Sequence, residues 1–135
     1  MIVVDTNVIA IASFGGPDHA LADATLMRDR VWTAPWLWRH EFRSVLRKQM
    51  TATELARPRA VAYFEQACAL VGGREHTVDA DHVLALAETS GCPTYDCEFV
   101  ALALALNSRL VTADRQLLRE FHGVAVSPEE FAAGG

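Results

Sequence analysis

Short runs of β-branched residues alternate with helical segments along the chain, and this alternation is what most constrains the fold. The first run, Ile2-Val3-Val4, stops at Asp5, as a buried parallel strand does where it passes into a helix. Further strands are expected at 31–33, 109–112 and 124–126. The pattern predicts a three-layer α/β/α domain in which a central, mostly parallel β-sheet lies between helices.

The intervening segments have the apolar spacing and the boundary residues of helices. Helices are expected at 18–28, 35–50, 60–71, 79–91, 99–106 and 115–121. Pro35 suits the first turn of the second of these helices, which would place Glu41 inside it. Pro93-Thr94-Tyr95 is expected to be a brief extended piece, after which Asp96 opens the next helix.

Length and composition limit the classes of protein that this chain can be. A chain of 135 residues suits one domain, and we expect residues 1–135 to form it. The N-terminus has neither the basic nor the apolar region of a signal peptide, and no apolar run could span a membrane, so a cytoplasmic protein is expected. The net charge of −5 argues against a general nucleic-acid coat protein. A positive mean hydropathy of +0.13 favours burial of surface against another chain.

Three aspartates occupy the same local context. Asp5, Asp96 and Asp114 each follow a segment expected to be extended and precede a helix. Such junctions gather at one edge of a parallel sheet, where these folds place their ligands. Carboxylates brought close together are usually stabilised by protonation or by a cation, and oxygen ligands favour magnesium or manganese.

Each of these carboxylates also has a simpler explanation. An aspartate before a helix is among the best N-cap residues, so any of the three could be structural. Glu41 lies inside the expected helix and caps nothing, but a helical glutamate is usually solvated. The residues taken singly therefore leave a metal site and a set of ordinary helix caps both open.

Four segments together resemble the signature of PIN domains, and most closely that of VapC-type toxins. They are Val3-Val4-Asp5-Thr6-Asn7-Val8, Glu41 in its helix, Tyr95-Asp96-Cys97-Glu98-Phe99-Val100-Ala101-Leu102-Ala103, and Leu110-Val111-Thr112-Ala113-Asp114. The resemblance implies a metal site of Asp5, Glu41, Asp96 and Asp114, in which Glu41 is a ligand or an acceptor for a metal-bound water. It also implies supporting hydroxyl groups from Thr6 and Thr112.

The resemblance implies a Mg²⁺- or Mn²⁺-dependent endoribonuclease that hydrolyses RNA with metal-activated water. It further implies a homodimeric toxin, silenced by a VapB-like antitoxin. The alternatives are a PIN-fold RNA-processing nuclease without an antitoxin and a catalytically inactive PIN-like binding module. A response-regulator receiver domain would need a phospho-acceptor aspartate after its third strand and a later lysine, which we cannot place.

Several residues outside the acidic set are candidates for contacts with RNA or protein. Arg39 and Arg43 lie one turn apart on one face of the expected helix and, with Arg115, could guide a phosphate backbone, although such charges are usually only solvated. Three tryptophans, Trp32, Trp36 and Trp38, could stack on bases, but core packing or burial under a partner is the more common role of such residues. Trp36, Leu37 and Phe42 are candidates for the apolar contact with an antitoxin.

Overall fold

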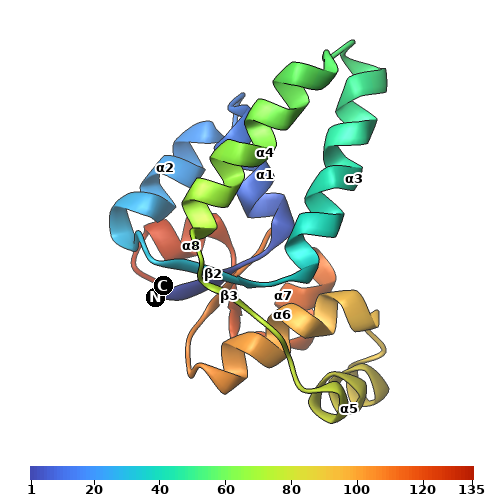
Figure 1. Cartoon of the computed structure of the whole chain (residues 1–135). Coiled ribbons are helices and arrows are strands. Elements are labelled where there is room, and N and C mark those ends of the chain that lie inside the picture. Colours follow the sequence, from blue (N-terminus) through green and yellow to red (C-terminus); the bar gives the residue numbers. More distant parts are fainter.

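Five short strands form the centre of the structure, a computed structural model that describes residues 1–135 (Figure 1). They are β1 (Ile2–Val4), β2 (Trp32–Pro35), β3 (Glu75–His76), β4 (Leu110–Val111) and β5 (Ala125–Val126). Their order across the sheet is β3-β2-β1-β4-β5, and every neighbouring pair is parallel. The predicted α/β fold with a central parallel sheet is confirmed.

Eight helices surround this sheet. They are α1 (Thr6–Phe14), α2 (His19–Arg28), α3 (Leu37–Ala52), α4 (Arg57–Val71), α5 (Ala80–Ser90), α6 (Thr94–Ala105), α7 (Arg115–Glu120) and α8 (Pro128–Ala132). In Figure 1, α1 to α4 lie above the sheet and α5 to α7 below it, while α8 packs beside α2. Every helix falls short of the length and apolar character needed to cross a membrane.

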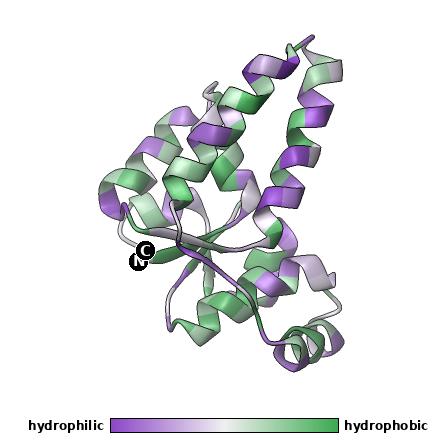
Figure 2. Cartoon of the chain, in the orientation of Figure 1, coloured by the Kyte–Doolittle hydropathy of each residue, from purple (hydrophilic) through white to green (hydrophobic).

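The hydrophobic core lies between the sheet and the two helix layers. Strand β1 and helix α6 are rich in hydrophobic residues, whereas β3 is hydrophilic and α3 and α4 alternate between hydrophobic and hydrophilic positions (Figure 2). Every residue of α6 from Phe99 to Ala103 is buried. Helix α6 is therefore enclosed on more than one face, which fixes its first turn close to the ends of the strands.

Aromatic packing fixes the rotation of α3. The rings of Trp38 and Phe42 lie with their centroids 5.9 Å apart, and both pack against Phe64 of α4. Phe14 of α1 stacks on Phe42 from the other side at 5.8 Å. Because residues 38 and 42 point into this cluster, Glu41 projects from a different side of α3, toward the ends of the strands.

Two of the predicted boundaries are wrong. Pro35 is the last residue of β2, not part of a helical first turn, and the backbone N–H of Trp36 continues the ladder by donating to His76 O at 3.1 Å. A proline at a strand end costs little, because the N–H that it lacks is then not needed inside the ladder. The segment 93–95 is not extended: Pro93 occupies the N-cap position, and α6 begins at Thr94. Strand β3 was not predicted at all.

Candidate active site

Four carboxylates line a single hollow beyond the carboxyl ends of β1 and β4. The hollow has a volume of about 400 Å³, and its acidic residues are Asp5, Glu41, Asp96 and Asp114. They come from four separate segments, and the fold brings together all four residues that the sequence singled out. None of them forms an ion pair with a basic side chain.

Asp5 is the most deeply buried member of this set, with 6% of its surface exposed. It caps α1 by accepting a hydrogen bond from the backbone N–H of Thr6 at 2.7 Å, and it accepts another from the Thr112 hydroxyl at 2.7 Å. Burial raises the pKa of the Asp5 carboxyl to about 7, and the charges of Glu41 and Asp96 act in the same direction. The hydrogen bonds to Asp5 therefore do not fully offset the cost of burying its ionised form.

Glu41 lies in the second turn of α3 and leans over the same hollow. The hydroxyl of Thr6 donates to its Oε1 at 2.7 Å, so the residue after Asp5 also holds Glu41. Burial raises the pKa of Glu41, and the charges of Asp96 and Glu98 raise it further. Glu41 caps no helix, and its position in the hollow distinguishes it from an ordinary solvated glutamate.

Asp96 reaches the hollow from the first turn of α6. It does not cap the helix and does not follow a strand, so the predicted shared context of the three aspartates holds only for Asp5 and Asp114. Burial raises the pKa of Asp96, and the negative charge of Asp114 raises it as well. With no N-cap role, Asp96 has no structural contact that would explain a partly buried carboxylate.

Asp114 combines a structural contact with a place in the hollow. Its Oδ1 accepts hydrogen bonds from the backbone N–H groups of Gln116 at 2.8 Å and Leu117 at 3.1 Å, which caps α7. Its Oδ2 makes no hydrogen bond within the protein and is left for a ligand. The N-cap explanation is therefore correct for Asp114, but it accounts for only one of its two oxygens.

Two side chains tie the first acidic segment to the last. Thr112 donates to Asp5 and accepts a hydrogen bond from the backbone N–H of Asp114 at 3.0 Å. Asn7 accepts a hydrogen bond from the backbone N–H of Ala113 at 3.2 Å through Oδ1, and its Nδ2 lies 3.5 Å from Asp5 Oδ2. The ends of β1 and β4 are thus cross-linked through polar side chains.

Three further polar residues of the hollow were not among the predicted site residues. Asn7, Ser44 and Lys48 line it beside the four carboxylates. Lys48 lies seven residues after Glu41, which is about two helical turns and hence the same side of α3. That spacing was a usable signal, and Lys48 is the one basic residue that lines the hollow.

The predicted RNA-binding arginines do not line the hollow. Arg39 is held by Glu75, whose side chain is 2% exposed, through an ion pair that includes a hydrogen bond of 2.8 Å. Arg43 contacts His40 at 3.0 Å and lies over the ring of Phe64. Arg115, the first residue of α7, is exposed. Of the three, Arg115 lies nearest in the chain to the acidic set.

The tryptophans and Phe42 divide between core and surface. Trp32 and Trp38 are fully buried, as their core-packing interpretation requires, whereas Trp36 is 47% exposed. Phe42 is also fully buried, so it is wrong as a candidate for contact with a partner. Its ring is already covered by Phe14, Trp38 and Phe64.

The chemistry of the hollow fits a hard divalent cation. Its donors are carboxylate and hydroxyl oxygens, and burial raises the pKa values of Asp5, Glu41 and Asp96, none of which forms an ion pair. As the side chains stand, no group of three or more His, Cys, Asp or Glu residues is arranged to hold a metal ion. Binding a cation would therefore require carboxylate side chains to turn toward one another.

Comparisons with known proteins agree with this architecture. The family model of the PIN domain matches residues 2–122. The crystal structure of PAE2754 from Pyrobaculum aerophilum superimposes with a TM-score of 0.77, covering 98% of this chain and 93% of that chain at 21% sequence identity. At that identity the likeness concerns the fold. No curated protein matches the sequence significantly.

Proposed function

This chain belongs to the PIN domain family, whose fold is of the nuclease type, and on that premise we propose that it is a cytoplasmic, Mg²⁺- or Mn²⁺-dependent endoribonuclease. The observation that carries the proposal is the hollow in which Asp5, Glu41, Asp96 and Asp114 meet without forming an ion pair to a basic side chain. Neutralising such a cluster is the function of a divalent cation in enzymes that act on phosphodiesters.

The proposed roles follow from the contacts of each side chain. Asp5, Asp96 and Asp114 would hold the metal, with Glu41 as a fourth ligand or as an acceptor for a water. When bound, the metal would supply the positive charge that a phosphodiester needs as it is attacked by water. Thr6 holds Oε1 of Glu41, which leaves Oε2 free to accept a proton from the attacking water. Burial raises the pKa of Glu41, which makes its carboxylate a stronger base for that proton.

Lys48 and the hydroxyl groups complete the proposed mechanism. The ammonium group of Lys48 would attract the phosphate backbone toward an otherwise acidic hollow. Thr112 keeps one oxygen of Asp5 in place, and Asn7 together with Thr112 holds the loop after β4. A hydrolysis of this kind needs no serine, cysteine or histidine nucleophile.

The test is cleavage of an RNA labelled at one end, with separated products. We expect cleavage with magnesium or manganese, none in EDTA, and no recovery with calcium, whose larger and looser coordination shell orients water poorly. Asp114→Asn keeps an N-cap residue before α7 and should abolish cleavage. Full activity of the wild-type protein in EDTA would contradict the metal mechanism.

We further propose a VapC-like toxin role, with a homodimer and a VapB-like antitoxin as partners. An apolar groove between α3 and α4 supports a protein partner. Its lining residues are the apolar Leu46, Met50, Ala60, Val61 and Phe64 and the basic Arg43, Arg47 and Arg57. Such a groove suits an amphipathic partner segment with acidic residues along its edges.

The toxin role is tested separately from the nuclease activity. Expression of the wild-type chain alone should arrest growth, and coexpression with its proposed antitoxin should restore growth. The Asp96→Asn variant, expressed to the same level, is the matched control and should be harmless. Cleavage of RNA in vitro without growth arrest in cells would indicate an RNA-processing nuclease that has no antitoxin.

A further inference from the structure

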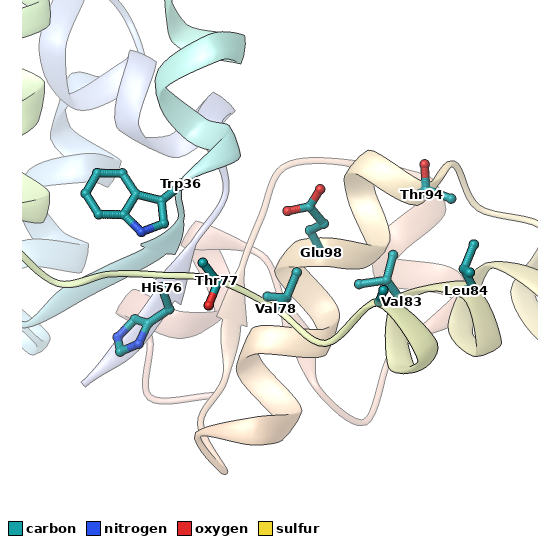
Figure 3. Close-up of a pocket in the computed structure, with 9 residues that line it drawn as sticks. Trp36, His76, Thr77, Val78, Val83, Leu84, Thr94 and Glu98 are labelled. Atoms are coloured by element: carbon teal, nitrogen blue, oxygen red, sulfur yellow. The ribbon is translucent and has the colours of Figure 1, made fainter.

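A second hollow lies beside the acidic one, and nothing in the proposed mechanism uses it. Its volume is about 480 Å³, and it is formed by the start of α3, the segment after β3, and helices α5 and α6. In Figure 3, Trp36 lies on one side, Val83 and Leu84 lie on the other, and the carboxylate of Glu98 lies between them. Thr77 and Thr94 add hydroxyl groups to its walls.

The two hollows share helices α3 and α6. Helix α3 has Trp36 at its N-cap and Glu41 in its second turn, and α6 carries both Asp96 and Glu98. Glu98 is near enough to Glu41 for its charge to act on that carboxyl group. If a phosphate of an RNA chain lies in the acidic hollow, a neighbouring base of that RNA would therefore be within reach of the second hollow.

Trp36 has the properties of a stacking platform. It is 47% exposed, in contrast to the fully buried Trp32 and Trp38. The guanidinium carbon of Arg39 lies 5.2 Å from the centroid of its ring, and Arg39 is itself fixed by Glu75. An indole that is held in place but only half covered can stack on a base without first losing much conformational freedom.

Glu98 is the one acidic side chain in the lining of this hollow. Its side chain is half-buried on the wall of the hollow and makes no hydrogen bond or ion pair within the protein. An ionised carboxylate only accepts hydrogen bonds, so its ligand must donate. Among the RNA bases, guanine presents two adjacent donors, N1–H and the 2-amino group, which match the two oxygens of one carboxylate.

We propose that this hollow binds a guanine base of the RNA substrate, stacked on the indole of Trp36 and donating to the carboxylate of Glu98. The proposal rests on the proposed nuclease function and adds a sequence preference to it. A second copy of this chain is the competing occupant, but the cores of protein interfaces are depleted in charged residues, and Glu98 lies in the middle of the hollow. A base with two donors satisfies that carboxylate directly.

Nucleoside monophosphates test the hollow without any cleavage, because they contain no phosphodiester bond to hydrolyse. Guanosine 5′-monophosphate and uridine 5′-monophosphate are titrated into the magnesium-loaded protein, and binding is followed by calorimetry and by tryptophan emission. Trp36 is the only exposed tryptophan, so quenching reports on this hollow. We expect the guanine nucleotide to quench emission and to bind about tenfold more tightly than the uracil nucleotide.

Substitutions of Trp36 and Glu98 test which side chain makes each proposed contact with the base. Trp36→Leu keeps an apolar side chain without the aromatic face and should weaken binding of the guanine nucleotide about tenfold. Glu98→Gln should remove the preference for guanine over uracil. Met27→Ala, at an exposed residue of α2 that does not line the hollow, is the matched control and should bind as the wild type does. Circular dichroism melting checks that each variant is folded.

The outcomes separate this proposal from the nuclease function. Equal binding of both nucleotides by wild type, Trp36→Leu and Glu98→Gln would overturn it, even if the protein cleaves RNA. So would a dimer, measured by light scattering, that dissociates in Trp36→Leu while nucleotide binding is unchanged, because the hollow would then be a subunit contact. If the nucleotides bind as expected but no RNA is cleaved, the proposed nuclease activity is wrong and the guanine site stands.

Discussion

The hydroxyl of Thr112 donates a hydrogen bond to Oδ2 of Asp5 across 2.7 Å, although the two residues lie 107 positions apart in the chain. This bond opposes the effect of burial and lowers the pKa of Asp5 relative to what burial alone would produce. The end of β4 thereby determines how readily a carboxylate at the end of β1 ionises. If Asp5 must be ionised to bind metal, Thr112 controls activity without touching the substrate.

Thr112→Val should therefore shift the acid limb of the pH–rate profile to higher pH. The change removes the bond that favours the ionised form of Asp5, so its pKa rises above its present value of about 7. It also leaves the partly buried backbone N–H of Asp114 without its acceptor, which should cost about 1 kcal/mol of stability. Thr112→Ser keeps the hydroxyl and should restore the profile. If the acid limb of Thr112→Val is not shifted, ionisation of Asp5 does not limit the rate at low pH.

Replacement of the proposed metal ligands Asp96 and Asp114 should separate stability from cleavage. Asp96 caps no helix, so Asp96→Asn should abolish cleavage and leave the free energy of unfolding unchanged or slightly higher, since charge repulsion is relieved. Asp114→Ala should also abolish cleavage, but at a cost of about 1 kcal/mol from the lost cap of α7. Urea unfolding and RNA cleavage measure the two effects. Wild-type cleavage by Asp96→Asn at saturating magnesium would exclude Asp96 from the site.

Arg39 should prove to be a stabilising residue. Its guanidinium and the indole N–H of Trp38 both bond to the buried carboxylate of Glu75. Arg39→Gln should lower the free energy of unfolding by about 2 kcal/mol, since Glu75 loses a charged partner, while the partial exposure of Arg39 limits the loss. Arg43→Gln is the matched control, because Arg43 forms no ion pair, and should change stability by less than about 0.5 kcal/mol. Equal effects in urea unfolding would contradict the structural role.

The sequence was sufficient for the parts of the site that local chemistry determines. Asp5 and Asp114 stand where a β-branched run meets a helix, and the parallel topology alone brings such positions together. The same argument also selected Asp96, although Asp96 lies in the first turn of α6 and follows no strand. The resemblance to PIN domains was needed to distinguish Glu41 from a solvated helical glutamate. The boundary at Asp96 was missed by two residues, because Pro93 was interpreted as part of an extended piece although its backbone angles suit an N-cap.

What the sequence could not supply were contacts between distant polar residues. Strand β3 consists of Glu75 and His76, two polar residues without any apolar run, so no periodicity marks it. Arg39 pairs with Glu75, which lies 36 residues away on that unpredicted strand, so this ion pair could not be predicted from the sequence. The exposure of Trp36 beside two buried tryptophans likewise follows from packing rather than from the spacing of residues.

The metal-free protein should lose stability as the pH rises from about 4 to about 7. The pKa of Asp5 is about 7 in the folded protein and 3.8 without burial, so the folded state holds its proton more tightly than the unfolded state does. Its contribution is fully present below the unfolded pKa and is lost as the pH rises through the folded one, by up to about 4 kcal/mol. Asp29 and Glu75, whose pKa values are lowered, act in the opposite sense and only at more acidic pH. Urea unfolding in EDTA at a series of pH values measures this loss. Asp5→Asn should make the curve less steep and leave the loss contributed by Glu41 and Asp96, whose pKa values are also raised. Saturating magnesium should abolish the loss in the wild-type protein. A stability that is independent of both pH and magnesium between these limits would show that Asp5 is not an uncompensated buried carboxylate.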